Sequence, residues 1–218
     1  MDRLQRRMKT LVELFKHYRL IPVVILDRAE DAEPLGEALL QAGLPLIEIT
    51  FRTDAAAEAI RRICRRLPEM TVGAGTVIRA DQAQAALDAG AAFIVSPGFS
   101  AAVSDFCIRQ ELPYFPGVAT ATEIQMALDR QWRILKYFPA EASGGVRTLR
   151  AIAAPFPEVQ FIATGGITGE NLADYLKLDC LLACGGSWFV QRQLISRRAF
   201  DEISGRVQSA LRHVAKAT

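Results

Sequence analysis

Short, wholly apolar runs recur at nearly regular intervals along the chain. They are rich in β-branched side chains and do not alternate with polar residues, which is typical of parallel strands covered on both faces. Eight such runs predict eight strands, at residues 22–26, 46–50, 70–73, 93–96, 114–116, 134–138, 161–164 and 180–184.

Between these runs, apolar residues recur with the spacing of amphipathic helices. The clearest stripes consist of Leu35, Leu39 and Ala42; of Ile60, Ile63, Cys64 and Leu67; and of Ile203, Val207, Leu211 and Val214. Gly43 and Gly90 lie between a predicted helix and the next strand, where a C-cap requires positive φ. Eight such units predict an α/β protein with a single (β/α)8 TIM barrel. The alternative is an open doubly wound sheet, but it gives no reason for eight near-equal units, and no G-x-G-x-x-G motif follows the first run.

An additional helix is predicted before the first strand. Its apolar stripe consists of Leu4, Met8, Leu11, Phe15 and Tyr18, and its other face is rich in Arg and Lys. We expect residues 1–20 to close the bottom of the barrel, the alternatives being a membrane-surface helix or a transit peptide. Because no linker, low-complexity stretch or change of composition divides the sequence, we expect residues 1–218 to form one domain.

Composition narrows the classes of function. Half of the 218 residues are hydrophobic and the net charge is only +2, which excludes nucleic-acid binding by bulk charge. No apolar run has the length of a membrane span, and the N-terminus lacks the apolar segment of a secretory signal. The four cysteines form no C-x-x-C pair and have no matching histidine cluster, so we expect neither a metal site nor disulfides, but buried thiols in a reducing cytoplasm.

Two charged residues lie within predicted buried strands. Lys136 is in the run ILKYF, and Glu48 is in the run LIEIT. A buried amine loses hydration, and in its neutral form it is a nucleophile that can make a Schiff base with a carbonyl compound. A buried carboxylate near it could hold the lysine or move protons. The alternatives are a lysine that reaches solvent from the strand end and a purely structural ion pair.

Other candidates follow the predicted strands, at the barrel face where enzymes of this fold place their chemistry. Arg52 follows the second strand and suits a carboxylate or phosphate, although a surface salt bridge is the alternative. Adjacent glycines follow the seventh strand (Gly165 and Gly166) and the eighth (Gly185 and Gly186). Backbone N–H groups of such loops can bind phosphate, and plain tight turns are the alternative. Together these residues indicate a Schiff-base enzyme acting on a phosphorylated keto compound.

The sequence resembles the class I 2-keto-3-deoxy-6-phosphogluconate (KDPG) and 4-hydroxy-2-oxoglutarate (KHG) aldolase family over about residues 21–190. The resemblance rests on the order and spacing of seven motifs: EITFRT at 48–53, GAGTV at 73–77, SPG at 96–98, KYFPAE at 136–141, GGV at 144–146, TGGI at 164–167 and GGSW at 185–188.

The resemblance implies roles for individual residues. Lys136 would form the Schiff base, and Glu48 would be the general acid and base. Further substrate contacts would come from Arg52, Thr76, Pro97, Phe138 and Thr164. The phosphate would be bound by Gly165, Gly166, Gly186 and Ser187.

The resemblance also implies the reaction and its setting. KDPG would be cleaved to pyruvate and D-glyceraldehyde 3-phosphate, and KHG to pyruvate and glyoxylate, with no cofactor and no metal. The protein would be a cytoplasmic homotrimer in the Entner–Doudoroff pathway, with no nucleic-acid or membrane partner. The alternatives are an aldolase for the galactonate epimer, an isomerase or decarboxylase barrel that binds phosphate without imine chemistry, and a non-catalytic binding barrel.

Overall fold

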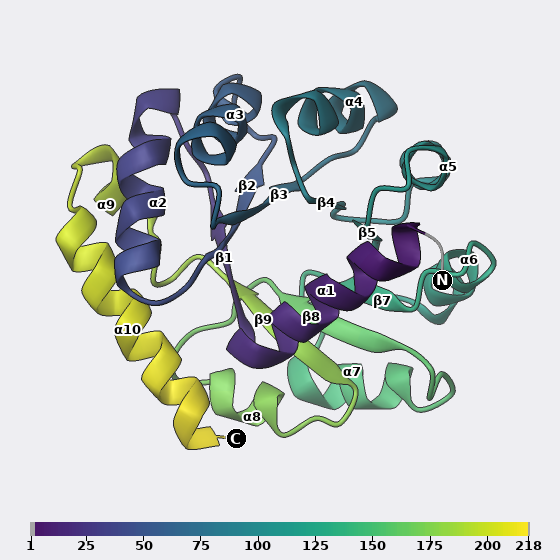
Figure 1. The fold of residues 1–218 in the computed structure, drawn as a ribbon. Helices are drawn as coiled ribbons and strands as arrows, with labels where there is room; N and C mark the ends of the chain where they lie inside the picture. The colour runs from purple at the N-terminus through teal and green to yellow at the C-terminus, as the bar shows by residue number, and fades with distance from the viewer. Residues whose placement is uncertain (1–2, 218) are drawn as a thin grey trace.

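The chain forms a barrel of parallel strands surrounded by helices (Figure 1), as a computed structural model describes it for residues 3–217. The strand segments within this range are β1 (Leu20–Val24), β2 (Leu46–Thr50), β3 (Thr71–Gly75), β4 (Phe93–Val95), β5 (Tyr114–Phe115), β6 (Gly117–Val118), β7 (Ile134–Tyr137), β8 (Gln160–Thr164) and β9 (Leu181–Gly186). Neighbours follow the order β5-β4-β3-β2-β1-β9-β8-β7-β6, and the pairs are parallel. The predicted (β/α)8 barrel is confirmed.

The barrel closes through one interrupted strand. β5 pairs with β4, and β6 pairs with β7, so the two short segments serve as halves of the fifth barrel strand. Pro116 lies between them and has no N–H to donate, which interrupts the regular ladder. Its carbonyl still accepts a hydrogen bond from the backbone N–H of Lys136 at 2.8 Å. The fifth predicted strand, at residues 114–116, is therefore two segments around a proline.

Several strands differ from their predicted bounds by one or two residues, and β1 and β9 show the physical reason most clearly. β1 begins at Leu20, two residues before the predicted start, and ends at Val24. β9 continues to Gly186 instead of ending at residue 184. Both differences arise from the pairing of these two strands, in which Leu20 aligns with Cys184 and Pro22 aligns with Gly186. The hydrophobic pattern of one strand does not predict how that strand aligns with its neighbour.

Helices follow the strands and form the outer layer. Their bounds are η1 (Ala29–Asp31), α2 (Ala32–Gln41), α3 (Ala56–Arg66), α4 (Ala80–Ala89), α5 (Ala101–Arg109), α6 (Ala121–Leu128), α7 (Gly145–Ala153), α8 (Leu172–Leu176), α9 (Arg192–Ser196) and α10 (Phe200–Ala217). The long α10 packs against both α2 and α8 and completes the ring (Figure 1). Gly90 ends α4 with a φ of 99°, as its C-cap position predicts.

The predicted N-terminal helix, α1 (Arg3–Tyr18), lies across the end of the barrel where the strands begin (Figure 1). Phe15 is fully buried, and its ring centroid lies 5.5 Å from that of Phe93 and 5.4 Å from that of Phe115. The Arg7 guanidinium donates to the carbonyl of Glu111 at 3.0 Å. The apolar face of α1 is thus used to close the barrel bottom.

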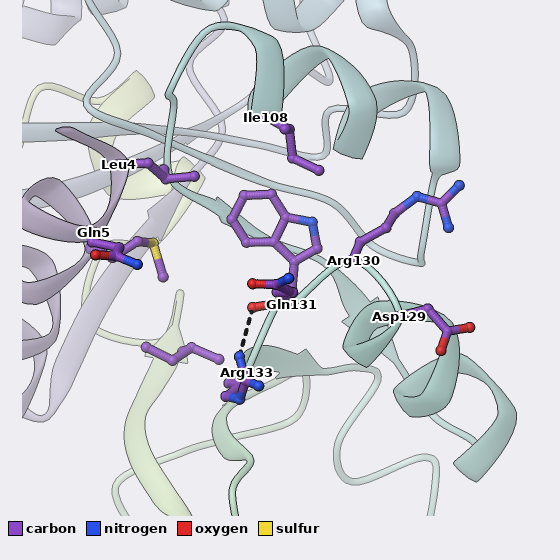
Figure 2. A pocket seen from close by; sticks show the side chains of 10 residues that line it. Leu4, Gln5, Ile108, Asp129, Arg130, Gln131 and Arg133 are labelled. Atoms are coloured by element: carbon purple, nitrogen blue, oxygen red, sulfur yellow. Dashed lines mark hydrogen bonds between the residues drawn. The ribbon is translucent and has the colours of Figure 1, made fainter. Parts of the chain in front are cut away.

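A groove of about 630 Å³ runs between α1 and the turn that leads from α6 to β7 (Figure 2). Its walls include Leu4 of α1, Ile108 of α5 and Arg133 of the turn. Because α1 covers the strand starts, this groove lies at the opposite end of the barrel from the residues that follow the strands.

Candidate active site

Lys136 and Glu48 meet inside the barrel. They lie on β7 and β2, which are on opposite sides of the ring once β5 and β6 are taken as one strand. The Lys136 Nζ donates to the Glu48 Oε1 at 3.3 Å, and only 6% and 2% of the two side chains are exposed. Water therefore has little access to either charge, and each compensates the other. The structure brings together the two residues that the sequence singled out as buried charges.

Gly75 leaves the space that the Glu48 carboxylate occupies. A Cβ atom at this last residue of β3 would overlap Oε1 of Glu48. Gly75 aligns with Thr50 on β2, so the two strands hold it beside the carboxylate. The sequence analysis missed this residue, although a glycine that ends a strand is a signal of a close approach.

Phe138 continues the chain just beyond β7. The centroid of its ring lies 5.3 Å from the Lys136 Nζ, within the range of a cation–π contact. The ring is partly buried. An aromatic face beside the amine supplies an apolar wall on one side of the reactive nitrogen.

Arg52 and Thr76 extend from neighbouring strands at the mouth of the barrel. Arg52 follows β2, and Thr76 follows β3. The Arg52 Nε donates a hydrogen bond to the Thr76 hydroxyl at 3.4 Å. Thr76 has a φ of 55°, a left-handed conformation that is uncommon for a residue other than glycine. The exposed guanidinium is placed to meet an anionic group that enters from solvent.

Pro97 follows β4 and lies against the fifth barrel strand. A Cβ atom at Gly117 would overlap the Pro97 backbone, so the close packing of these two segments depends on that glycine. Ser96 accepts a hydrogen bond from the Tyr114 hydroxyl at 3.0 Å, which fixes the residue before the proline. Burial raises the pKa of Tyr114 to about 12, so its hydroxyl remains a donor at neutral pH.

The two glycine loops lie side by side because β8 and β9 are paired. Thr164 aligns with Gly185, so the residues after each strand leave the barrel together. Gly165 and Gly166 have φ values of 102° and 81°, which a residue with a Cβ rarely adopts. Ser187 is exposed directly after β9. A Cβ at Gly186 would overlap the ring of Trp188, which explains the glycine there.

The Thr164 hydroxyl is buried and has no hydrogen-bond partner among the residues that the structure describes. Thr164 ends β8, immediately before the two glycines. An unpaired buried hydroxyl is unfavourable unless something else satisfies it. This atom is therefore a candidate contact for a ligand between the glycine loops and the ion pair.

Residues 3–217 contain neither a cluster of metal ligands nor a membrane-spanning helix. No group of three or more His, Cys, Asp or Glu side chains is placed to hold a metal ion. No helix in the same range combines the length and apolarity needed to cross a bilayer.

Comparisons with known proteins show the family to which the chain belongs. The family described as KDPG and KHG aldolase matches residues 11–206. A 2-dehydro-3-deoxy-phosphogluconate aldolase of Treponema pallidum is 45% identical over 207 residues, which cover 95% of this chain and 99% of that protein. A KHG/KDPG aldolase of Escherichia coli K12 is 38% identical over 192 residues, covering 88% and 90% of the two chains.

A solved structure of this family has a similar overall fold. The KDPG aldolase of Legionella pneumophila, with pyruvate captured as a covalent carbinolamine intermediate, superposes with a TM-score of 0.88 at 36% identity. The alignment covers 91% of this chain and 97% of that one. Both the matched length and the level of identity extend the resemblance seen in the motifs to nearly the whole sequence. The chain therefore belongs to the KDPG and KHG aldolase family.

Proposed function

We propose that the protein is a class I aldolase that cleaves KDPG to pyruvate and D-glyceraldehyde 3-phosphate. The observation that carries the proposal is the buried ion pair of Lys136 and Glu48, which places an amine and a proton acceptor 3.3 Å apart. Membership of the KDPG and KHG aldolase family supports the choice of substrate. A Schiff-base mechanism needs both groups in a site from which water is largely excluded.

The reaction begins with imine formation. The Lys136 ammonium loses a proton to a base, and the carboxylate of Glu48, its hydrogen-bond partner, would be that base. The neutral amine adds to the C2 ketone of the substrate and gives a carbinolamine. Protonated Glu48 then returns a proton to the C2 hydroxyl, which leaves as water and leaves a cationic iminium.

Carbon–carbon cleavage follows because the iminium accepts electrons. A base removes the proton of the C4 hydroxyl, the C3–C4 bond breaks, and its electron pair moves into the imine system to give an enamine. Glyceraldehyde 3-phosphate leaves as the aldehyde product. The enamine takes a proton at C3, and hydrolysis of the resulting imine releases pyruvate and the free lysine.

The remaining candidates would orient the substrate at its two ends. Arg52 and Thr76 would bind the carboxylate of the pyruvyl half, since a guanidinium forms strong charge-assisted hydrogen bonds with carboxylates. Pro97 and Phe138 would flank the imine, and the latter ring already lies beside the Lys136 Nζ.

The phosphate end would be held by the loops after β8 and β9. Gly165, Gly166 and Gly186 would offer backbone N–H groups, and Ser187 would add a hydroxyl. The buried Thr164 hydroxyl, which lacks a partner in the described part of the chain, would contact the substrate between the phosphate and the imine.

Several broader features belong to the same proposal. We infer that KHG is a second substrate, because one family comprises both activities. We further propose a single domain over residues 1–218, a homotrimeric assembly, a cytoplasmic location and a role in the Entner–Doudoroff pathway. The phosphorylated keto acid is the only partner that the proposal requires.

The test is an assay of pyruvate release on three substrates: KDPG, its C4 epimer with the galactonate configuration, and KHG. We expect the highest kcat/KM for KDPG and measurable turnover of KHG. A preference for the epimer would replace the proposed substrate by its isomer. No pyruvate from any of the three would instead favour an isomerase, a decarboxylase or a binding barrel.

A further inference from the structure

The segment that follows β7 lies along the first glycine loop. The N–H of Ala140 donates to the Thr164 carbonyl at 2.8 Å, and the N–H of Glu141 donates to the Gly165 carbonyl at 3.0 Å. The Glu141 Cβ also fills the space beside Gly166, because a Cβ on that glycine would come within 2.6 Å of it. Glu141 therefore supports the loop by a backbone hydrogen bond and by side-chain packing.

These contacts fix the direction of the loop's peptide groups. In a trans peptide the C=O and the following N–H point in opposite directions. Because Glu141 holds the Gly165 carbonyl, the N–H of Gly166 points away from Glu141. The Asn171 amide holds the Gly166 carbonyl at 3.0 Å in the same way, which turns the N–H of Ile167 away from Asn171. The donors of the loop are thus aimed by the residues behind it.

The Glu141 side chain is itself held by a buried phenol. The Tyr175 hydroxyl donates to the Glu141 Oε1, and the tyrosine is fully buried on α8. Glu141 is exposed, so its long side chain would otherwise sample many rotamers. Burial and the adjacent carboxylate raise the pKa of Tyr175, so the phenol keeps its proton and remains a donor.

We propose that Tyr175 and Glu141 are positioning residues that hold the loop of Gly165 and Gly166 in the geometry that receives the substrate phosphate. Neither residue needs to touch the substrate. The inference rests on the proposed function, since it assumes that this loop binds the phosphate of KDPG. The inference gives a role to Tyr175 of α8 and to Glu141 after β7, neither of which has a role in the family resemblance.

The first test is Tyr175→Phe, which removes only the hydroxyl. We expect the KM for KDPG to rise about tenfold while kcat changes little, because misplaced binding groups weaken substrate capture. The rate at which borohydride traps pyruvate on the protein should stay within about twofold of the unaltered protein, because pyruvate has no phosphate. Tyr18→Phe, at the opposite end of the barrel, is the control and should change neither quantity.

A second pair of variants keeps the inference testable if Tyr175→Phe folds poorly. Glu141→Gln retains an oxygen that can accept from Tyr175 and should keep the KM for KDPG within about threefold of the unaltered protein. Glu141→Ala removes both the acceptor and the packing beside Gly166, and it should raise KM at least as much as Tyr175→Phe. A purely structural role predicts instead that thermal stability falls and that pyruvate trapping is lost in parallel with KDPG cleavage.

The outcomes separate this inference from the proposed function. If the unaltered protein neither traps pyruvate nor cleaves KDPG, the proposed function fails. If the unaltered protein does both, two results would overturn the positioning role while the aldolase activity stands. One is that Tyr175→Phe and Glu141→Ala leave the KM for KDPG within about twofold of the unaltered protein. The other is that these variants reduce pyruvate trapping as much as they reduce KDPG cleavage.

Discussion

Lys136 and Glu48 extend from strands on opposite sides of the barrel, yet their side chains meet in an ion pair that solvent hardly reaches. Such a pair is not an efficient means of stabilising a fold, because removing two charges from water offsets most of their attraction. Replacing both by apolar residues would serve stability as well. The presence of this buried pair among mostly apolar strands is explained by chemistry that needs an amine next to a carboxylate.

Replacing Glu48 by Gln tests the proton-transfer role. The amide can still accept a hydrogen bond from Lys136, but it cannot accept and return a proton, so we expect kcat on KDPG to fall by roughly 10²–10⁴. Glu37→Gln, at an exposed position on α2, is the matched control and should leave kcat unchanged. An unaltered rate in Glu48→Gln would mean that another group moves the protons.

Replacing Lys136 by Arg tests the nucleophile while keeping a positive charge opposite Glu48. A guanidinium stays protonated and cannot add to a ketone, so this variant should fold and be inactive. Circular dichroism would establish the fold, and pyruvate release from KDPG would establish the activity. Lys177→Arg, at the exposed end of α8, provides the control. Turnover of Lys136→Arg within about tenfold of the unaltered protein would contradict the assignment.

Gly75→Ala tests whether the space beside the carboxylate matters. The added methyl group would overlap Oε1 of Glu48, so we expect Glu48 to shift and kcat to fall, by about tenfold to a hundredfold. The same substitution at Gly205, in α10 where a Cβ meets no atom within 4 Å, should stabilise the helix by about 0.5–1 kcal/mol. Equal activity of Gly75→Ala and Gly205→Ala would show that the carboxylate tolerates displacement.

Stability should decline in alkali because the folded barrel keeps buried acids protonated. Burial raises the pKa of both Cys107 and Cys184 to about 12, from an ordinary value of 9.0. Above pH 9 the unfolded chain therefore loses these protons while the folded chain retains them, and the free energy of unfolding falls as pH rises. Urea denaturation at a series of pH values measures this slope, and Cys107→Ala should reduce it. A free energy that stays constant from pH 9 to pH 11 would contradict the burial of these thiols.

The barrel could be predicted because its signals are local. Apolar runs and helical stripes alternate along the chain, and a charged residue within an apolar run, such as Lys136 or Glu48, is conspicuous in the sequence. The interruption at Pro116 and the early start of β1 at Leu20 could not be predicted in this way. Both depend on which strand lies alongside and in which register, and that is fixed only when the barrel closes.

The residues that hold the candidate site in place could not be predicted from the sequence either. Glu141 resembles an ordinary loop residue, and Tyr175 resembles a core aromatic of a short helix. Their hydrogen bond joins positions 34 residues apart, and no periodic pattern links them. Gly75 belongs to a motif that the sequence analysis quoted, but only the packing of the folded barrel shows that it lies against the Glu48 carboxylate. The roles of Arg52 and the phosphate loops stay predictions.

The most direct measurement of the central claim is reduction of the protein by borohydride in the presence of pyruvate, followed by peptide mass spectrometry. The account predicts a reduced pyruvyl adduct on Lys136, none on the four other lysines, and none on any lysine when pyruvate is omitted. An adduct on a different lysine, or no adduct in a protein that releases pyruvate from KDPG, would contradict it.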